Sequence, residues 1–400
     1  MLKEKKRNRA RRHTLKLFLG LCVMLAAGGF LGRNLAGRVQ EVSQKQEIPF
    51  APIVIEEQDV SERYCYTLLA EAERNVYKEL LQGIQDGESE IYVHLSDPGR
   101  VNEIYRYVLT DYPELFWCDG STRTTSYTIP EEYSVVEPGY SVSGTELEMR
   151  RAQIENAADA FFASVSDELS EYEKIKLVYE YIINTVEYNA SAPENQNIYS
   201  VFVNRESVCA GYAKATQYLL NRMGIFCTYV TGTVRGGDTH AWNIVRCDGA
   251  YYHVDTTWGD PVFLMAENSV PQAEQYINYD YLCCPDQELY RTHTPDDRTQ
   301  YPACTETTYE YYRMNGMYYE MADREQMMEV LQRSIEAGSS QVSFKYPDQT
   351  VYQQARELLF NGVLEEAAQY LGRWYALSSV SYYYQEDEEA ARITIFWQYE

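Results

Sequence analysis

The chain has 400 residues, 45% of them hydrophobic, which is enough to bury the cores of roughly two to three domains. These values exclude a disordered tail, a collagen and a small disulfide-stapled scaffold. The formal net charge is −25, from 35 basic and 60 acidic residues. Because proteins that bind nucleic acid carry a basic surface, this charge argues against nucleic acid as a partner.

The N-terminal end differs from the rest of the chain in charge and hydropathy. Residues 1–38 hold ten Lys or Arg and one acidic residue, so the remainder has a formal charge of −34. An apolar run, residues 17–32, comes directly after the basic flank. This order keeps the N-terminus in the cytoplasm and sends the rest of the chain across the membrane. We therefore predict a signal-anchor over 1–38 and an extracytoplasmic remainder; cleavage near Ala36, giving a secreted protein, is the alternative.

The region after this segment predicts a stalk and then an α/β region. Residues 39–60 lack helical periodicity, which is typical of a stalk, and the α/β region spans 61–145. Its expected elements are helices over 61–84 and 99–111, a strand over 90–95 and short strands within 125–145.

The next domain is predicted over residues 146–300, and within it the pattern changes from helices to one helix followed by three strands. The candidate catalytic residues described below all fall in this domain. The dipeptide Asp248-Gly249 is typical of a tight hairpin turn between the last two strands. The expected elements are helices over 146–167, 170–187 and 209–223, and strands over 225–233, 239–247 and 250–257.

Residues 301–400 predict a separate small α+β domain without a catalytic signature. The chain as a whole is thus expected to be α+β. The elements expected in this last domain are strands over 307–313, 316–320, 341–346 and 392–399, and helices over 322–337 and 349–370.

Cys209 is the first candidate for chemistry, since it opens a predicted helix in the segment ESVCAGYAKA. Unpaired backbone N–H groups and the positive end of the helix dipole favour a thiolate there. The small residue Gly211 leaves room for a substrate carbonyl, and the Cys209 backbone N–H is placed to contact its oxygen. A free cysteine that merely packs in the core is the alternative at this point.

His240 and Asp255 supply the groups that a nucleophilic thiol needs. His240 lies on one predicted strand and Asp255 on the next, and a hairpin turning at Asp248-Gly249 pairs positions whose numbers sum to about 497. At that register a His side chain and an Asp side chain meet, so His240 accepts the thiol proton and Asp255 orients it. His253 shares a face with Asp255 and is the rival base or a packing residue.

Three motifs in this order resemble the transglutaminase-like superfamily of papain-fold cysteine enzymes. They are VCAGYAKA at 208–215, HAWNIV at 240–245 and YYHVDTTWGDP at 251–261. The resemblance covers about 172–262, and the flanking regions look like bacterial membrane-anchored members displayed at the cell surface. It implies a papain-like core, in which the helix that bears the cysteine packs on an antiparallel sheet.

The resemblance also implies Cys209 as nucleophile, His240 as base and Asp255 as the orienting carboxylate. No second oxyanion donor matches a family motif. The residues expected to line a substrate pocket are Trp242, Trp258, Gly211 and Tyr212.

We expect no cofactor and no metal. The sequence has no D-x-[DN]-x-[DN]-G calcium loop, no C-x-x-C pair and no Cys/His zinc spacing. The expected partner is a protein or peptide substrate, Lys-rich or associated with the cell wall, because the acidic remainder attracts cations.

Three functions fit these residues. Hydrolysis of an amide and transfer of the acyl group to an amine share one thioester intermediate, so the three catalytic residues do not separate them. The third is a binding or scaffold module that keeps the fold without chemistry.

Overall fold

The computed structural model describes residues 48–166, 168–260, 277–296 and 301–399, and it confirms the α+β class. The chain forms two compact units, of which the first ends at Ala160 and the second begins at Phe161. The sequence predicts more segments than these two units, and the predicted boundaries stay predictions. The predicted signal-anchor lies outside the described residues, and within the described ranges no helix is long and apolar enough to cross a membrane.

The first unit packs helices against an antiparallel sheet of three strands, in the order β1-β3-β2. The predicted helix over 61–84 is in fact interrupted, because the buried Asp111 carboxylate accepts the backbone N–H groups of Cys65 and Tyr66 and the Tyr77 hydroxyl. Ala70 is extended there and Glu73 caps the helix that comes after it. The elements are α2 (Glu57–Val60), α3 (Tyr64–Thr67), α4 (Glu71–Asp86), β1 (Ile91–Val93), α5 (Pro98–Asp111), β2 (Cys118–Tyr127) and β3 (Tyr133–Tyr140).

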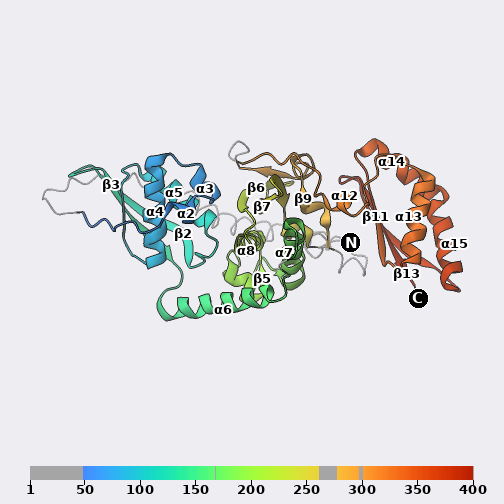
Figure 1. Ribbon diagram of the computed structural model, residues 1–400, viewed down its shortest axis with the longest axis horizontal. Helices are drawn as coiled ribbons and strands as arrows, with labels where there is room; N and C mark the ends of the chain where they lie inside the picture. Colours follow the sequence, from blue (N-terminus) through green and yellow to red (C-terminus); the bar gives the residue numbers. More distant parts are fainter. Residues whose placement is uncertain (1–47, 167, 261–276, 297–300, 400) are drawn as a thin grey trace, which may run out of the picture. The chain divides into compact units, whose positions relative to one another are not determined.

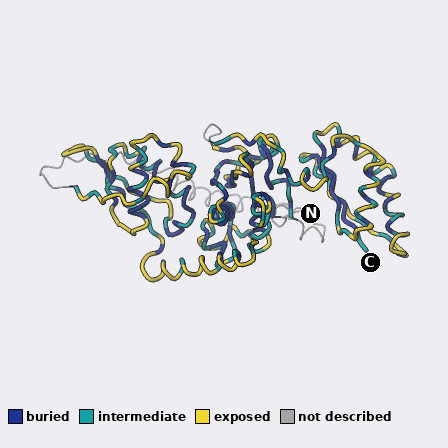
Figure 2. Tube along the Cα trace, in the orientation of Figure 1, coloured by how far each residue is buried: buried dark blue, intermediate teal, exposed yellow. Residues whose placement is uncertain are grey.

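Helix α6 (Gly144–Phe162) crosses the boundary between the units, and Figure 2 shows most of its length as exposed. Helix α7 (Glu171–Thr185) begins at a capping box, in which Ser170 and Glu173 satisfy each other's backbone N–H groups. Helix α8 (Cys209–Arg222) packs on strands β6 and β7, and Asn243 of β7 donates its side-chain amide to the Ala213 carbonyl.

The sheet beneath α8 has five antiparallel strands, and β7 and β8 pair in the register predicted from the Asp248-Gly249 turn. Asn243 pairs with Val254 and Cys247 with Ala250. Strand β8 ends at Val254, short of the prediction, because the next residue caps the short helix α9 (Thr256–Gly259). The order is β10 (His293–Pro295), β6 (Cys227–Val234), β7 (Thr239–Cys247), β8 (Ala250–Val254) and β9 (Leu282–Cys284).

The C-terminal part has its own apolar core between a three-stranded sheet, in the order β11-β13-β12, and helices on one face (Figure 1). The predicted strands over 307–313 and 316–320 are wrong: Tyr318 makes a single bridge to Lys345, and α12 (Tyr311–Met314) precedes it. The predicted helix over 349–370 breaks at Gly362, whose φ is 129°. The elements are α13 (Arg324–Glu336), β11 (Gln341–Lys345), α14 (Gln349–Leu358), α15 (Leu364–Tyr375), β12 (Ser381–Asp387), which was not predicted, and β13 (Arg392–Gln398).

Asp280 joins this sheet to the segment before β9 through buried ion pairs. Its carboxylate lies 2.8 Å from Lys345 Nζ and 2.8 Å from Arg392 Nε, and both basic side chains are 1% exposed. Burial opposes ionisation of Asp280, but the charges of Arg392 and Lys345 outweigh it and lower the pKa of this carboxyl. The next residue, Tyr281, accepts the backbone N–H of Asp255 at 3.0 Å. Asp280 and Tyr281 thereby connect the C-terminal sheet to Asp255.

We predict that Asp280→Asn lowers the free energy of unfolding by about 3 kcal/mol, because it leaves two buried cations without their shared counter-charge. The measurement is urea denaturation of the full chain. Arg324→Gln, at an ion pair with Glu366 in which both side chains are about half exposed, is the control and changes the free energy by less than about 1 kcal/mol. Equal effects of the two variants would contradict the prediction.

Candidate active site

Cys209 is the first residue of α8 and is partly exposed. Gly211, two residues after Cys209, packs the first turn of the helix against the preceding loop. A Cβ there would lie 2.0 Å from Ser207 Oγ and 3.2 Å from the Asn197 carbonyl oxygen. This corrects the expectation that Gly211 leaves room for a substrate, because the chain itself fills that room. Position 211 needs a glycine because the first turn of α8, which begins at Cys209, lies so close to Ser207 and Asn197.

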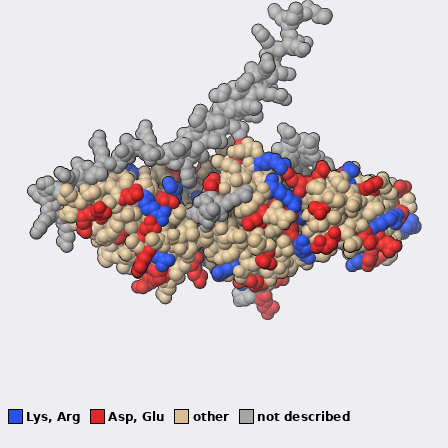
Figure 3. Space-filling model, turned by 90° about the horizontal axis from the view of Figure 1, so that it is seen from above, with Lys and Arg blue, Asp and Glu red and all other residues tan. Residues whose placement is uncertain are grey.

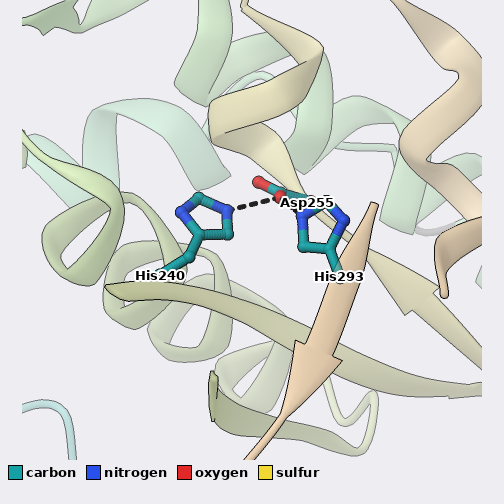
Figure 4. A group of neighbouring side chains, drawn as sticks. All are labelled: His240, Asp255 and His293. Carbon is teal, nitrogen blue, oxygen red and sulfur yellow. Dashed lines mark hydrogen bonds and ion pairs between the residues drawn. The ribbon is translucent and has the colours of Figure 1, made fainter. Parts of the chain in front are cut away.

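His240 joins Cys209 to Asp255. Its Nε2 lies 2.7 Å from Asp255 Oδ2, and its side chain also hydrogen bonds to that of Cys209. Figure 4 shows the second ring nitrogen of His240 pointing away from Asp255. Burial opposes a charge on His240, but the Asp255 carboxylate outweighs it and raises the pKa of the imidazole to about 10. The structure thus brings together the three residues predicted to carry the chemistry, and it favours a charged imidazolium beside the thiol.

The Asp255 carboxylate is fixed by its position in the sequence as a helix cap. Its Oδ1 accepts the backbone N–H groups of Thr257 at 2.9 Å and Trp258 at 3.1 Å, which leaves Oδ2 for imidazole donors. Burial raises its pKa, but the His240 charge and hydrogen bonds from two histidines outweigh burial and hold the pKa below its usual range. The D-T-T-W motif therefore orients the carboxylate through local backbone geometry.

His293 is the second histidine on Asp255, and no sequence motif predicted it. Its Nε2 lies 3.0 Å from Asp255 Oδ2, and its side chain is fully buried. In Figure 4 the rings of His240 and His293 lie on either side of the carboxylate. The available signal was weak: His293 is one of five histidines in the chain, but it stands in a loop-rich stretch without a motif.

Two of the residues predicted to line a substrate pocket have no exposed side chain. Trp242 is fully buried and donates its indole N–H to His253 Nδ1 at 3.2 Å. Tyr212 is also fully buried, and its hydroxyl lies 2.9 Å from the Val186 carbonyl and 3.0 Å from Asp260 Oδ2. Both pack beneath the site, so the prediction of a pocket wall is corrected for these two. Trp258 is partly exposed, with its ring 6.2 Å from that of His240.

Two tyrosines near Cys209 were also not predicted. Burial raises the pKa of Tyr188 and of Tyr229, and the charge of Cys209 adds to both shifts, so both hydroxyls lie within electrostatic range of the sulfur. Both are partly exposed. Their spacing from Cys209 in the sequence gives no sign of this proximity, because they lie on β4 (Glu187–Tyr188) and β6.

His253 belongs to a different cluster, in which it packs rather than acts as a base. Its Nε2 lies 2.8 Å from Asp286 Oδ1, while Cys304 is the third member of the group. Burial lowers the pKa of His253 and raises the pKa of the Cys304 thiol, and both side chains are fully buried. A neutral imidazole and a protonated thiol without solvent access do not form a nucleophilic pair.

Two groups among the described residues offer three ligand atoms to a metal: His240 with Asp255 and His293, and His253 with Asp286 and Cys304. In the second group the Trp242 indole donates to Nδ1 of His253, so Nε2 carries the proton that it donates to Asp286. In the first group each imidazole already donates to the carboxylate. Mutual hydrogen bonds satisfy both groups, and the expectation of no metal stays a prediction.

Comparisons with known proteins agree with this geometry. Residues 159–256 match the family model of the transglutaminase-like superfamily. Mouse kyphoscoliosis peptidase is 26% identical over 106 residues, which are 22% of this chain and 16% of that protein. The chain thus spans about one sixth of this curated relative.

Solved structures of low similarity accompany these matches. One, described as a TGase, is 15% identical and covers 46% of this chain and 54% of its own, with a TM-score of 0.27. A proposed cysteine protease from Cytophaga hutchinsonii is 18% identical and covers 33% and 54%, with a TM-score of 0.25.

The helix, sheet and Cys-His-Asp arrangement define a papain-like core. The resemblance seen in the sequence is confirmed: the segment that holds Cys209, His240 and Asp255 matches the transglutaminase-like superfamily.

We predict that iodoacetamide alkylates Cys209 at least tenfold faster than Cys118 at pH 6, because a positive His240 favours the thiolate. Cys118 is the reference, since it is partly exposed like Cys209 whereas the other six described cysteines are buried. In Asp255→Asn the pKa of His240 falls and the advantage moves to higher pH. The rates are measured by peptide mass spectrometry.

Asp286→Asn is the matched control, because it removes the carboxylate that is hydrogen bonded to the other buried histidine, His253. An unchanged Cys209 profile in Asp255→Asn, or an equal shift in both variants, would contradict the assignment of the ion pair.

Proposed function

We propose that the protein is an extracytoplasmic cysteine enzyme that acts on amide bonds of proteins or peptides. The observation that carries this proposal is the His240–Asp255 contact of 2.7 Å beside a partly exposed cysteine at the start of a helix. The extracytoplasmic location rests on the charge and hydropathy of residues 1–38.

In the resting ion pair the Cys209 proton is already held on His240 Nδ1, and the chemistry begins when the Cys209 thiolate bonds to the substrate carbonyl carbon. The Cys209 backbone N–H, which has no intrahelical partner at the first position of α8, donates to the developing oxyanion. The amine leaves with the proton from His240, and a thioester forms on Cys209. Asp255 stabilises the imidazolium throughout because it remains ionised.

The thioester is then resolved by water or by a second amine. Water returns the free thiol and a carboxylic acid, whereas an amine forms a new amide bond. We favour hydrolysis, since the curated relative is named a peptidase. Transfer to an amine is the alternative outcome of the same site.

The substrate is expected to be a protein or peptide with basic side chains, including those at the cell wall. Outside residues 1–38 the formal charge is −34, which attracts cations over long range and also keeps the surface solvated. Figure 3 shows acidic side chains in several groups on the described surface, with basic side chains between them. This mixed pattern favours a peptide contacted at several points over one held by a single charged patch.

We predict that Cys209→Ser lowers turnover of a denatured, glutamine- and lysine-containing protein about 1000-fold or more, because the nucleophile is lost. The full chain in detergent is incubated with the protein and a fluorescent primary amine. New amino termini indicate hydrolysis, and bound fluorescence indicates transfer. Cys118→Ser is the control. If neither product forms and Cys209 reacts no faster than Cys118, the non-catalytic scaffold function replaces this proposal.

We predict that EDTA leaves this activity unchanged, because His240 and Asp255 supply the proton transfer and its electrostatic support. The same assay is run with and without the chelator, and with calcium added back. Loss of activity on chelation with recovery on addition of calcium would overturn the metal-free mechanism.

A further inference from the structure

We propose that His293 is a positioning residue for the Cys209–His240 pair, acting through the carboxylate of Asp255. This inference rests on the proposed function. His293 lies 37 residues beyond the end of the segment that matches the family model, so the matched segment alone does not contain it.

The Asp255 carboxylate receives four hydrogen bonds, which is the number that its two oxygens accept. The backbone N–H groups of Thr257 and Trp258 hold Oδ1. His240 and His293 share Oδ2, at 2.7 Å and 3.0 Å. Rotation of the carboxylate away from His240 would break all four bonds, so His293 completes the set that fixes its plane.

The imidazole of His293 is itself held in one orientation. Its Nδ1 lies 2.7 Å from Thr292 Oγ1, and its ring is surrounded by those of Trp258 at 4.8 Å, Trp242 at 5.2 Å and Tyr281 at 5.8 Å. Because Asp255 is ionised and accepts, Nε2 of His293 carries the donated proton. A buried, enclosed donor of this kind holds Asp255 without reaching the reacting atoms.

The sheet edge brings His293 to this position. Strand β10 pairs with β6, with His293 opposite Val234 and Pro295 opposite Gly232. Gly232 allows the close approach, since a Cβ there would lie 2.2 Å from the Thr294 carbonyl oxygen and 2.8 Å from Trp242 Cη2. Gly232 also pairs with His240 of β7, so this one glycine of β6 lies next to the strands of both histidines.

Loss of the His293 donor leaves Oδ2 with one partner and allows the carboxylate to turn, which weakens its support of the His240 imidazolium. In the full chain, we expect His293→Met to slow alkylation of Cys209 by iodoacetamide at pH 6 about tenfold. His293→Gln, of similar length but with an amide N–H where the imidazole has Nε2–H, restores most of the rate. Cys118 reports the intrinsic thiol reactivity in every variant.

The matched control is His253→Met, which removes the other fully buried imidazole that is bonded to a carboxylate. It is expected to lower the melting temperature but to leave the Cys209 rate within about twofold of the unaltered protein. If His293→Met does not fold, Thr292→Val, which removes the hydroxyl that holds Nδ1, is measured instead and slows alkylation in the same direction.

The outcomes separate the two proposals. If Cys209 of the unaltered protein reacts no faster than Cys118, the proposed function fails. If Cys209 is fast in the unaltered protein and equally fast in folded His293→Met or Thr292→Val, only the positioning role of His293 is overturned. The positioning role would also be overturned if Cys209 were alkylated slowly in His293→Gln while this variant kept the melting temperature of the unaltered protein. Restoring the hydrogen-bond donor would then not restore the reactivity of Cys209.

Discussion

The buried Asp255 carboxylate is the group on which the rest of the site depends. A negative charge with 1% exposure is costly unless every acceptor position is filled, and here two backbone N–H groups and two imidazoles fill them. The charge in turn keeps His240 protonated in spite of burial. The reactivity expected of Cys209 therefore depends on Asp255, which acts on the thiol through His240.

The surrounding fold serves to hold this carboxylate. Asp255 ends a strand and begins a short helix, and its backbone N–H is bonded to Tyr281. The neighbouring Asp280 is fastened to the C-terminal sheet by two buried cations. The segment at Asp280 and Tyr281 is thus bonded to the C-terminal sheet on one side and to Asp255 on the other, although the C-terminal part carries no catalytic motif.

The two His-Asp pairs, His240 with Asp255 and His253 with Asp286, show how environment separates chemistry from packing. His240 faces a partly exposed cysteine, and its carboxylate partner is fully saturated with donors. His253 has a similar distance to Asp286, but its second nitrogen accepts from Trp242 and its neighbouring thiol is buried. The same three residue types therefore give a candidate nucleophile in one place and, in the other, a hydrogen-bonded group around a neutral histidine and a buried thiol.

Local patterns in the sequence determined the α+β class, the helix that begins at Cys209 and the hairpin register that brings His240 to Asp255. These depend on periodicity and on one turn, whose residues Asp248 and Gly249 both take positive φ values. Tertiary structure alone decided the placement of His293, the burial of Trp242, the interruption near Asp111 and the Asp280 ion pairs. Each requires contacts between segments far apart in the chain, and no propensity or spacing encodes where two sheet edges will meet.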